Sequence, residues 1–240
     1  MTDLGSEAAL RLLELGALEI QGRILSASNA TFVGTVRQGD LAAECVYKPV
    51  RGERPLEDFP DRTLARRERA AFLVSESSGW SVVPPTVLRR DGPFGAGMAQ
   101  LWIDIDEAAD VWAMVGQPDE RLRRIALFDV VVNNADRKGG HLLPTADGHV
   151  YGVDHGICFA VEPKLRTVLW DWRGMPIAPV ELDVLRRLRV ALDGPLCEAL
   201  LRLLTEGEVR ATVARLERLL ATGRFPEPDP YRMVVPWPPF

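Results

Sequence analysis

The sequence predicts an α+β protein of two lobes, a small strand-rich lobe followed by a larger helical lobe. Residues 1–103 contain short strand-like runs separated by small polar turns, which is typical of antiparallel strands. Residues 104–240 show helical periodicity on either side of one hairpin pattern. A chain of 240 residues is long enough for one such bilobal unit. A cleft between the lobes is then the preferred place for a ligand.

The small lobe is expected to begin with a helix and to continue as an antiparallel meander. Ser6 can cap a first helix, which ends at Gly16. A loop rich in proline and charge, over residues 49–60, precedes a second helix that begins at Asp61 or Thr63. The expected strands span residues 18–25, 31–36, 41–47, 86–88 and 98–103.

The large lobe is expected to be helical around a single hairpin. The Asp-Gly pair at residues 147–148 favours a tight primed turn between two short strands. The Pro-rich residues 225–240 are expected to be extended. Two alternatives remain for them, packing across the helical lobe through Trp237 and Phe240, or mobility. The expected helices span residues 106–115, 120–133, 180–192, 195–204 and 206–221.

Composition argues against several classes of partner. The net charge of −5 argues against broad electrostatic binding to nucleic acid or to an anionic membrane surface. No apolar run approaches the ~18 residues that a membrane helix needs, so no stable membrane insertion is expected. The first residues lack the basic and apolar regions of a signal peptide. Cys45, Cys158 and Cys197 form no disulfide or zinc pattern, which favours a reducing cytoplasm.

One segment concentrates the chemically able side chains. Residues 129–158 hold all three histidines, two of the three asparagines and one of the three lysines. Loops that gather such side chains on a rigid scaffold are where function usually lies. Asp136 in the loop and Asp154 at the end of a strand are joined by the hairpin. Two carboxylates in this arrangement are typical of a phosphoryl-transfer site.

Lysine is rare in this chain, so each lysine calls for a local reason. Of 29 basic residues only three are lysines, and Lys48 lies at the end of a strand-like run. A lysine ammonium is a compact point charge that suits a phosphate where the broader arginine fork needs more room. The alternative is a surface lysine whose stem covers apolar neighbours.

Four motifs in a fixed order resemble the protein-kinase-like fold. The order is a lysine on a strand, a glutamate on a helix, a catalytic loop, a hairpin and a metal-binding aspartate. This order resembles that of the atypical branch of the fold, which includes phosphatidylinositol 3-/4-kinases and HipA-type kinases. More closely, the chain resembles a bacterial family similar to phosphatidylinositol 3- and 4-kinases. The motifs are Val46-Tyr47-Lys48-Pro49, Arg67-Glu68-Arg69-Ala70-Ala71, Asn133-Asn134-Ala135-Asp136-Arg137-Lys138 and Val153-Asp154-His155-Gly156.

The resemblance implies an ATP-dependent phosphotransferase that uses ATP with Mg²⁺ or Mn²⁺. By the resemblance, Lys48 holds the nucleotide phosphates and Glu68 pairs with it. Asp136 accepts or orients the hydroxyl proton of the acceptor, and Asp154 binds the metal. A protein side chain or a small molecule is favoured over a lipid as acceptor, because the chain lacks a basic patch. Further candidates are Arg137 and Lys138 in the catalytic loop, and Gln100, Leu101 and Trp102 on the hinge strand at the nucleotide.

Two features depart from the family pattern. His141 stands where a second metal ligand, asparagine, is usual, and neutral imidazole prefers softer metals than Mg²⁺. The second ligand is then His141 with Mn²⁺, or Asn134 or His155 contributes. The turn that would cover the phosphates has no G-x-G-x-x-G, although Ser28 and Asn29 could support a nest of backbone N–H groups.

Other interpretations of the same residues stay open. Glu53 or Glu57 could compete with Glu68 for Lys48. The missing asparagine suits a nucleotide-binding pseudokinase or scaffold, and a nucleotidyl transferase on the same fold is a further possibility. A metal-dependent hydrolase, with His141, Asp154 and His155 together with Asp136 binding a transition metal, ranks third, because no histidine pair has the spacing of H-E-x-x-H.

Overall fold

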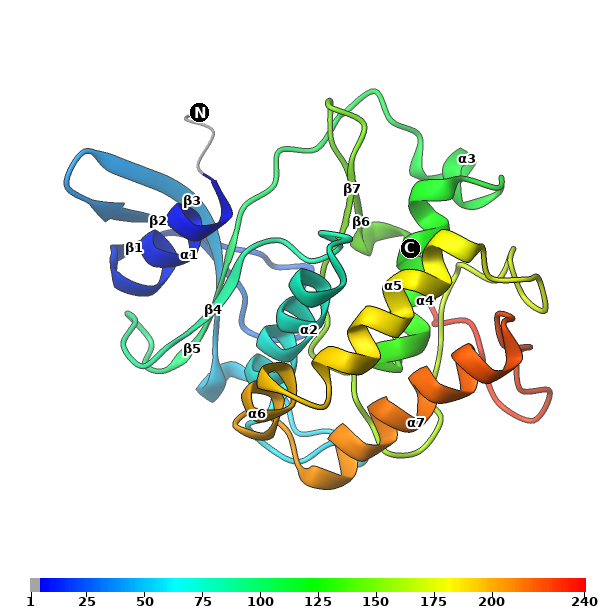
Figure 1. The fold of residues 1–240 in the computed structure, drawn as a ribbon. Coiled ribbons are helices and arrows are strands. Elements are labelled where there is room, and N and C mark those ends of the chain that lie inside the picture. Colours follow the sequence, from blue (N-terminus) through cyan, green and yellow to red (C-terminus); the bar gives the residue numbers. More distant parts are fainter. Residues whose placement is uncertain (1–4) are drawn as a thin grey trace.

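The small lobe is built on a five-stranded antiparallel sheet, as predicted. The computed structural model describes residues 5–240, and Figure 1 shows the sheet at one end of the molecule with α1 beside it. The strands pair in the order β1-β2-β3-β5-β4. The elements up to residue 101 are α1 (Ser6–Leu15), β1 (Ala17–Arg23), β2 (Phe32–Gln38), β3 (Leu41–Pro49), η1 (Val50–Gly52), α2 (Leu64–Ser78), β4 (Thr86–Arg89) and β5 (Gly97–Leu101).

The sheet and α1 share a small apolar core of their own. Val36, Cys45 and Ala99 are fully buried on the strands and pack with Leu12 and Leu13 of α1. Full burial of a Val- or Leu-sized side chain contributes about 1.5–3 kcal/mol, so this cluster fixes α1 on one face of the sheet.

The first helix differs from the prediction in both of its caps. Gly5, not Ser6, precedes the first helical residue, so Ser6 lies within the helix. Gly16 does end the helix, but its backbone is extended (φ −66°, ψ 148°) and not left-handed. A Cβ at this position would lie 2.6 Å from the carbonyl oxygen of Leu12, because the chain passes directly from α1 into β1.

Helix α2 packs into the main core of the molecule, beside the helices of the large lobe. It contacts α4, α5 and α6 as well as β4 and β5. Phe72 and Val74 of α2 lie in one continuous apolar cluster with Phe128 and Leu185 from the second half of the chain. The apolar core therefore does not divide at residue 103, although the sheet and the helices occupy different ends of the molecule.

The large lobe consists of helices around a short hairpin, and most of its predicted boundaries are within a few residues of those observed. The exception is the predicted helix 106–115, of which only α3 forms. Asp106 instead makes a turn, because its carboxylate accepts from the N–H of Ala108 and its own N–H donates to the carbonyl oxygen of Pro144. The elements are α3 (Val111–Val115), α4 (Glu120–Val132), η2 (Gly139–His141), β6 (Leu142–Pro144), β7 (Val150–Gly152), α5 (Pro179–Ala191), α6 (Pro195–Leu201) and α7 (Glu206–Thr222).

The residues after α7 were expected to be extended, but they turn at residues 230–231 and bend again at 232, 235 and 237–238, and one of the two named aromatic residues packs. Phe240 stacks on Trp112 of α3, whereas the side chain of Trp237 is 83% exposed. Gly148, in the hairpin turn between β6 and β7, has the positive φ (84°) that the Asp-Gly pair predicts.

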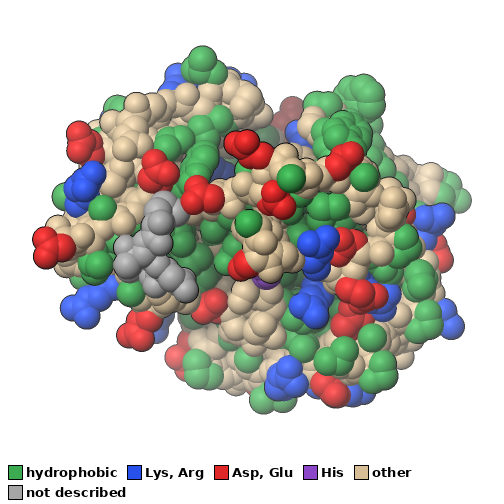
Figure 2. Space-filling model, turned by 90° about the horizontal axis from the view of Figure 1, so that it is seen from above, with side chains coloured by type: hydrophobic (Ala, Val, Ile, Leu, Met, Phe, Trp, Pro, Cys, Tyr) green, Lys and Arg blue, Asp and Glu red, His purple; other side chains and the backbone are tan. Residues whose placement is uncertain are grey.

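The surface carries both signs of charge. Figure 2 shows acidic and basic side chains interspersed on the face seen there, with apolar side chains between them. Within residues 5–240, no helix combines the length and the apolar character needed to cross a bilayer.

Candidate functional site

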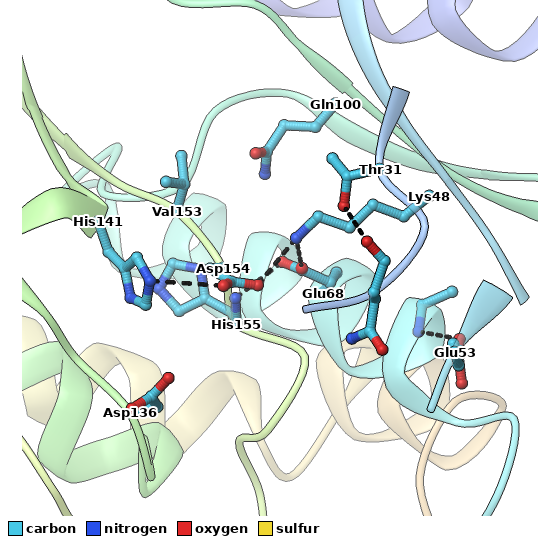
Figure 3. Close-up of polar contacts among 12 residues, drawn as sticks. Thr31, Lys48, Glu53, Glu68, Gln100, Asp136, His141, Val153, Asp154 and His155 are labelled. Atoms are coloured by element: carbon cyan, nitrogen blue, oxygen red, sulfur yellow. Dashed lines mark hydrogen bonds and ion pairs between the residues drawn. The ribbon is translucent and has the colours of Figure 1, made fainter. Parts of the chain in front are cut away.

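Lys48 lies at the centre of the site and contacts two carboxylates. It projects from the end of β3, where its Nζ lies 2.7 Å from Oε1 of Glu68 and 2.8 Å from Oδ1 of Asp154 (Figure 3). Burial disfavours the ammonium, but Asp154 and Glu68 outweigh that effect and raise the pKa of Lys48 above its usual value. Lys48 is therefore a fixed positive charge. Lys48 comes from a strand, Glu68 from a helix, and Asp154 from the end of the hairpin.

Glu68 connects Lys48 to the backbone beyond the hairpin. It is only 1% exposed, and its second oxygen, Oε2, accepts a hydrogen bond of 2.9 Å from the N–H of His155. The competing candidate Glu53 has another task, because its carboxylate accepts from the N–H groups of Leu64 and Ala65 at the start of α2. A carboxylate at a helix N-terminus is stabilised by the unpaired N–H groups and by the helix dipole. Glu53 thus fixes the helix that presents Glu68.

Asp154 occupies a strained backbone position at the mouth of the site. Its φ is +63°, a conformation that costs a non-glycine residue of order 1 kcal/mol and that clusters at functional sites. Its side chain is half exposed, and Lys48 holds the pKa of this carboxyl well below its usual range. Asp154 is therefore an accessible, ionised oxygen donor of the kind that a hard divalent cation prefers.

His141 faces the second oxygen of Asp154. Its Nε2 lies 3.4 Å from Oδ2 of Asp154, and its Nδ1 accepts from the N–H of Lys138. Burial, which outweighs the attraction of Asp154, lowers the pKa of His141 to about 4, so the imidazole is neutral at pH 7. With Nδ1 as acceptor, the ring proton lies on Nε2 and points at Asp154. In this tautomer His141 orients Asp154, and a ligand role through Nε2 needs that proton to leave.

Asp136 lies on the loop after α4, apart from the Lys48 cluster in Figure 3. Its backbone N–H donates to Oδ1 of Asn134, and its Oδ2 lies 3.4 Å from Nζ of Lys138. Burial raises the pKa of Asp136 above its ordinary value, although Lys138 opposes the change. A carboxylate with a raised pKa is a better proton acceptor than a free one.

A buried ionic network holds this loop in place, and it includes two of the predicted site residues. Arg137 and Asp129 are both fully buried and paired at 2.9 Å, and Asp129 also accepts from Nδ2 of Asn134. Arg137 also donates to the carbonyl oxygen of Val153, which follows the two strands of the hairpin in the sequence. Arg137, a predicted catalytic residue, and Asn134, a predicted metal ligand, both donate hydrogen bonds to Asp129 in the interior.

Asp129 is the functional residue that sequence reasoning missed. It lies inside the apolar stretch of α4, and its carboxylate holds two residues of the loop that follows. A charged residue within the apolar second half of α4, residues 125–132, was the available signal, since a buried carboxylate requires a partner.

The other predicted site residues lie on the sheet of the small lobe and in the turn between β1 and β2. Ser28 is exposed in the turn between β1 and β2, and Asn29 accepts from the N–H of Arg54, which ties that turn to the loop after β3. Gln100 is buried and its Nε2 donates to Oγ1 of Thr86. Leu101 and Trp102 follow at the end of β5, partly buried, with their N–H groups bonded to the carbonyl oxygens of Pro85 and Glu44.

The described residues offer a divalent cation one carboxylate directly and no complete ligand cluster. Residues 5–240 contain no group of three or more His, Cys, Asp or Glu side chains that could hold a metal ion. His155, a ligand candidate, is fully buried with its Nε2 2.6 Å from Arg137. The donor set fits a cation bound by Asp154 with other ligands from water and phosphate, and it does not fit the metal-hydrolase alternative.

A cavity of about 280 Å³ lies next to the site, and it is formed by the loop between β3 and α2. Its walls include Arg51, Phe59 and Leu64, and Phe59 and Leu64 also pack against Ala135, the neighbour of Asp136. Phe59 and Leu64 therefore lie between this cavity and the loop that carries Asp136.

Comparisons with known proteins agree with this arrangement. The chain is 46% identical, over 260 aligned positions, to protein Rv2133c of Mycobacterium tuberculosis, and the match covers 94% of this chain and 93% of that protein. It is 29% identical over 132 positions to phosphatidylinositol 4-kinase gamma 4 of Oryza sativa subsp. japonica, a match covering 48% of this chain and 23% of that protein. No protein-family model matches the sequence.

Among solved structures, the chain is similar to the Golgi casein kinase with Mn and ADP bound. The TM-score is 0.63 at 15% identity, and the match covers 93% of this chain and 80% of that one. At this identity the likeness concerns the fold, and it confirms the predicted α+β kinase-like architecture. The coverage and identity of the mycobacterial match go further: the chain belongs to the family of protein Rv2133c.

Proposed function

We propose that this chain is an ATP-dependent phosphotransferase of the atypical kinase class. The observation that carries the proposal is the position of Lys48, held between Glu68 and Asp154 at distances of 2.7 and 2.8 Å. The kinase-like fold and the partial match to a phosphatidylinositol 4-kinase support the same conclusion.

Each residue then has one task. Lys48 binds phosphate oxygens of ATP, and Glu68 keeps its ammonium in place from the buried side. Asp154 holds Mg²⁺ or Mn²⁺, which supplies positive charge against the transferred phosphoryl group. Asp136 takes the proton from the acceptor hydroxyl as the new P–O bond forms and the bond to ADP breaks. Lys138, 3.4 Å from Asp136, balances charge at that point.

The present arrangement of Lys48 has a consequence for binding. Its ammonium is saturated by two carboxylates, so ATP alone meets a site with little free positive charge. A divalent cation at Asp154 releases Lys48 from one of them. Nucleotide and metal should accordingly bind with positive cooperativity.

The acceptor is proposed to be a protein side chain or a small molecule. The net charge of −5 gives little electrostatic attraction to an anionic lipid surface. The cavity lined by Phe59 and Leu64 is separated from Asp136 by these two side chains, and its volume of about 280 Å³ suits a small acceptor or a side chain.

A nucleotide-binding protein without turnover is the second candidate. The tautomer of His141, with its proton toward Asp154, supports it, because the position of the usual second metal ligand is then filled by a hydrogen-bond donor. A nucleotidyl transferase would use the same Lys48 and Asp154 with a different leaving group.

Two measurements test the proposal. ATP with Mg²⁺ or Mn²⁺ should raise the melting temperature, and Lys48→Ala should remove most of that increase. Label from the γ-phosphate should reach the protein, water or an acceptor in cell extract, whereas label from the α-phosphate on protein would indicate nucleotidyl transfer. Absence of any thermal shift at millimolar nucleotide would refute the kinase-like function, and a shift without label transfer would favour the second candidate.

A further inference from the structure

Residues 234–240, here called the strap, lie beside the loop that carries Asp136 and contain neither helix nor strand. The side chains of Val235 and Trp237 are exposed, whereas Pro236 is buried. The carbonyl oxygen of Val234 accepts from the N–H of Thr167 at 2.9 Å. The strap is therefore attached to the large lobe through its backbone while some of its side chains face solvent.

The strap touches the catalytic loop at Gly139. The N–H of Gly139 donates to the carbonyl oxygen of Pro239 at 2.8 Å. The ring of Phe240 lies between Gly139 and the indole of Trp112, with ring centroids 3.2 Å apart and planes inclined by 19°. Trp112 belongs to α3, which itself contacts η2. Phe240 thus fills the space between a helix and the loop that follows Asp136.

Gly139 is required to be a glycine by this one contact. A Cβ at Gly139 would overlap the ring of Phe240, and the three nearest atoms are all from that ring. The backbone at Gly139 has no positive φ that would itself exclude a side chain. At the neighbouring Gly140 a Cβ would meet nothing within 4 Å. The two adjacent glycines therefore form a matched pair, one in contact with the strap and one free of it.

Gly139, where the strap touches the loop, is close in sequence to both Asp136 and His141. Gly139 lies three positions after Asp136 and begins η2, which ends at His141. The Nε2 of His141 lies 3.4 Å from Oδ2 of Asp154. The position of η2 therefore sets how far His141 reaches toward Asp154.

We propose that the strap is a positioning element for the catalytic loop, and that Phe240 is its positioning residue. It holds Gly139–His141 against α3. In this way it fixes the positions of Asp136 and His141 relative to Asp154. The positioning effect on catalysis rests on the proposed phosphotransferase function, whereas the hold on the loop does not.

The hold on the loop is tested by amide hydrogen exchange in the full chain. Phe240→Ala should speed exchange at residues 137–142 by roughly 2- to 10-fold, the factor expected when one backbone hydrogen bond is lost. Trp237→Ala, which removes a larger but exposed aromatic ring from the same segment, should leave these amides unchanged. Equal exchange in the wild type and Phe240→Ala would overturn the proposal, provided that both proteins melt as folded species.

The glycine pair gives an independent test of the same contact. Gly139→Ala should lower the melting temperature and speed exchange over the strap, whereas Gly140→Ala should do neither. In the double variant Gly139→Ala/Phe240→Ala the added methyl group meets no ring, so the two effects should be clearly less than additive. Additive effects, or equal effects of the two glycine substitutions, would count against the strap.

Turnover separates positioning from mere stability. Phe240→Ala should lower kcat for ATP consumption with little change in KM for ATP, because Lys48 and Glu68 are untouched, and Phe240→Tyr should restore kcat. A rise in KM alone, or no rescue by tyrosine, would reject the positioning role. If the wild type consumes no ATP, the phosphotransferase function fails, and the exchange comparison still decides whether the strap holds the loop.

Discussion

Arg67 and Glu208, 141 positions apart, form a buried ion pair that joins α2 to α7. Arg67 also donates to the carbonyl oxygen of Cys158, just beyond the hairpin. Because Glu68 is the next residue on α2, the same turn of helix anchors itself in the large lobe and presents the partner of Lys48. The packing of the large lobe therefore helps to set the position of Glu68.

Removal of the charge at Glu208 should destabilise the protein strongly. Glu208→Gln keeps a side chain that can continue to cap α7 with Thr205, but it leaves the Arg67 guanidinium buried without an opposite charge. Loss of one partner from a buried pair costs roughly 3 kcal/mol. Urea unfolding measures the change in the free energy of unfolding.

The control for this variant lies two residues earlier on the same helix. Glu206 forms an exposed pair with Arg210, so Glu206→Gln should change the free energy of unfolding by at most about 0.5 kcal/mol. Equal effects of the two substitutions would mean that the buried pair does not anchor α2.

The sequence was a good guide to the elements on which the candidate site residues lie. It was a poor guide to the buried residues that hold those elements in place. Lys48 at a strand end, Glu68 on a helix and Asp154 after a hairpin follow from local patterns and from their order along the chain. The structure brings these three residues into direct contact. Asp136 lies on the predicted loop and is not in contact with that cluster in Figure 3.

The supports could not be predicted because they depend on tertiary contacts. The pairing of Asp129 with Arg137 joins a helix interior to an irregular loop, and no periodicity specifies it. The same applies to the failure of the predicted helix 106–115, where contacts of Asp106 with Ala108 and Pro144 replace helical hydrogen bonds. Helical propensity is a weak prior when such contacts compete.

Metal preference should depend on His141. If His141 contributes a ligand beside Asp154, the wild type should prefer Mn²⁺ over Mg²⁺, because imidazole is a softer donor than an amide oxygen. His141→Asn should shift the preference back toward Mg²⁺. Activity and ATP-induced thermal shift, each titrated with either metal, measure the preference. Identical metal profiles in the two proteins would leave His141 with only the orienting role that its present tautomer supports.

With metal removed by a chelator, the free energy of unfolding should decrease as the pH falls, because His141 becomes protonated more readily in the unfolded chain. The pKa of His141 is about 4 in the folded protein, below its model-peptide value of 6.5, so the unfolded chain takes up the proton first. The contribution is complete above pH 6.5, decreases as the pH falls, and is fully lost near pH 4. The shift corresponds to roughly 3 kcal/mol over this window.

A comparison with His141→Asn isolates this contribution. The buried His155 has its pKa lowered as well and Asp136 has its pKa raised, but both are present in the two proteins and cancel in the difference. The free energy of unfolding of the wild type should therefore approach or fall below that of the variant as the pH drops from 7 to 4. Parallel curves across this range would contradict the burial of a neutral His141.

Asp136→Asn should abolish turnover and preserve nucleotide binding. The amide keeps the shape of the side chain but cannot accept the acceptor's proton, and loss of a general base typically lowers kcat by about 10²- to 10⁴-fold. Because Asp136 is apart from the Lys48 cluster, the thermal shift with ATP and metal should stay close to that of the wild type. Asp40→Asn, in the exposed turn between β2 and β3, serves as the matched substitution and should leave both quantities unchanged. A wild-type rate in Asp136→Asn would move the proton acceptor elsewhere, whereas loss of the thermal shift would place Asp136 in nucleotide or metal binding.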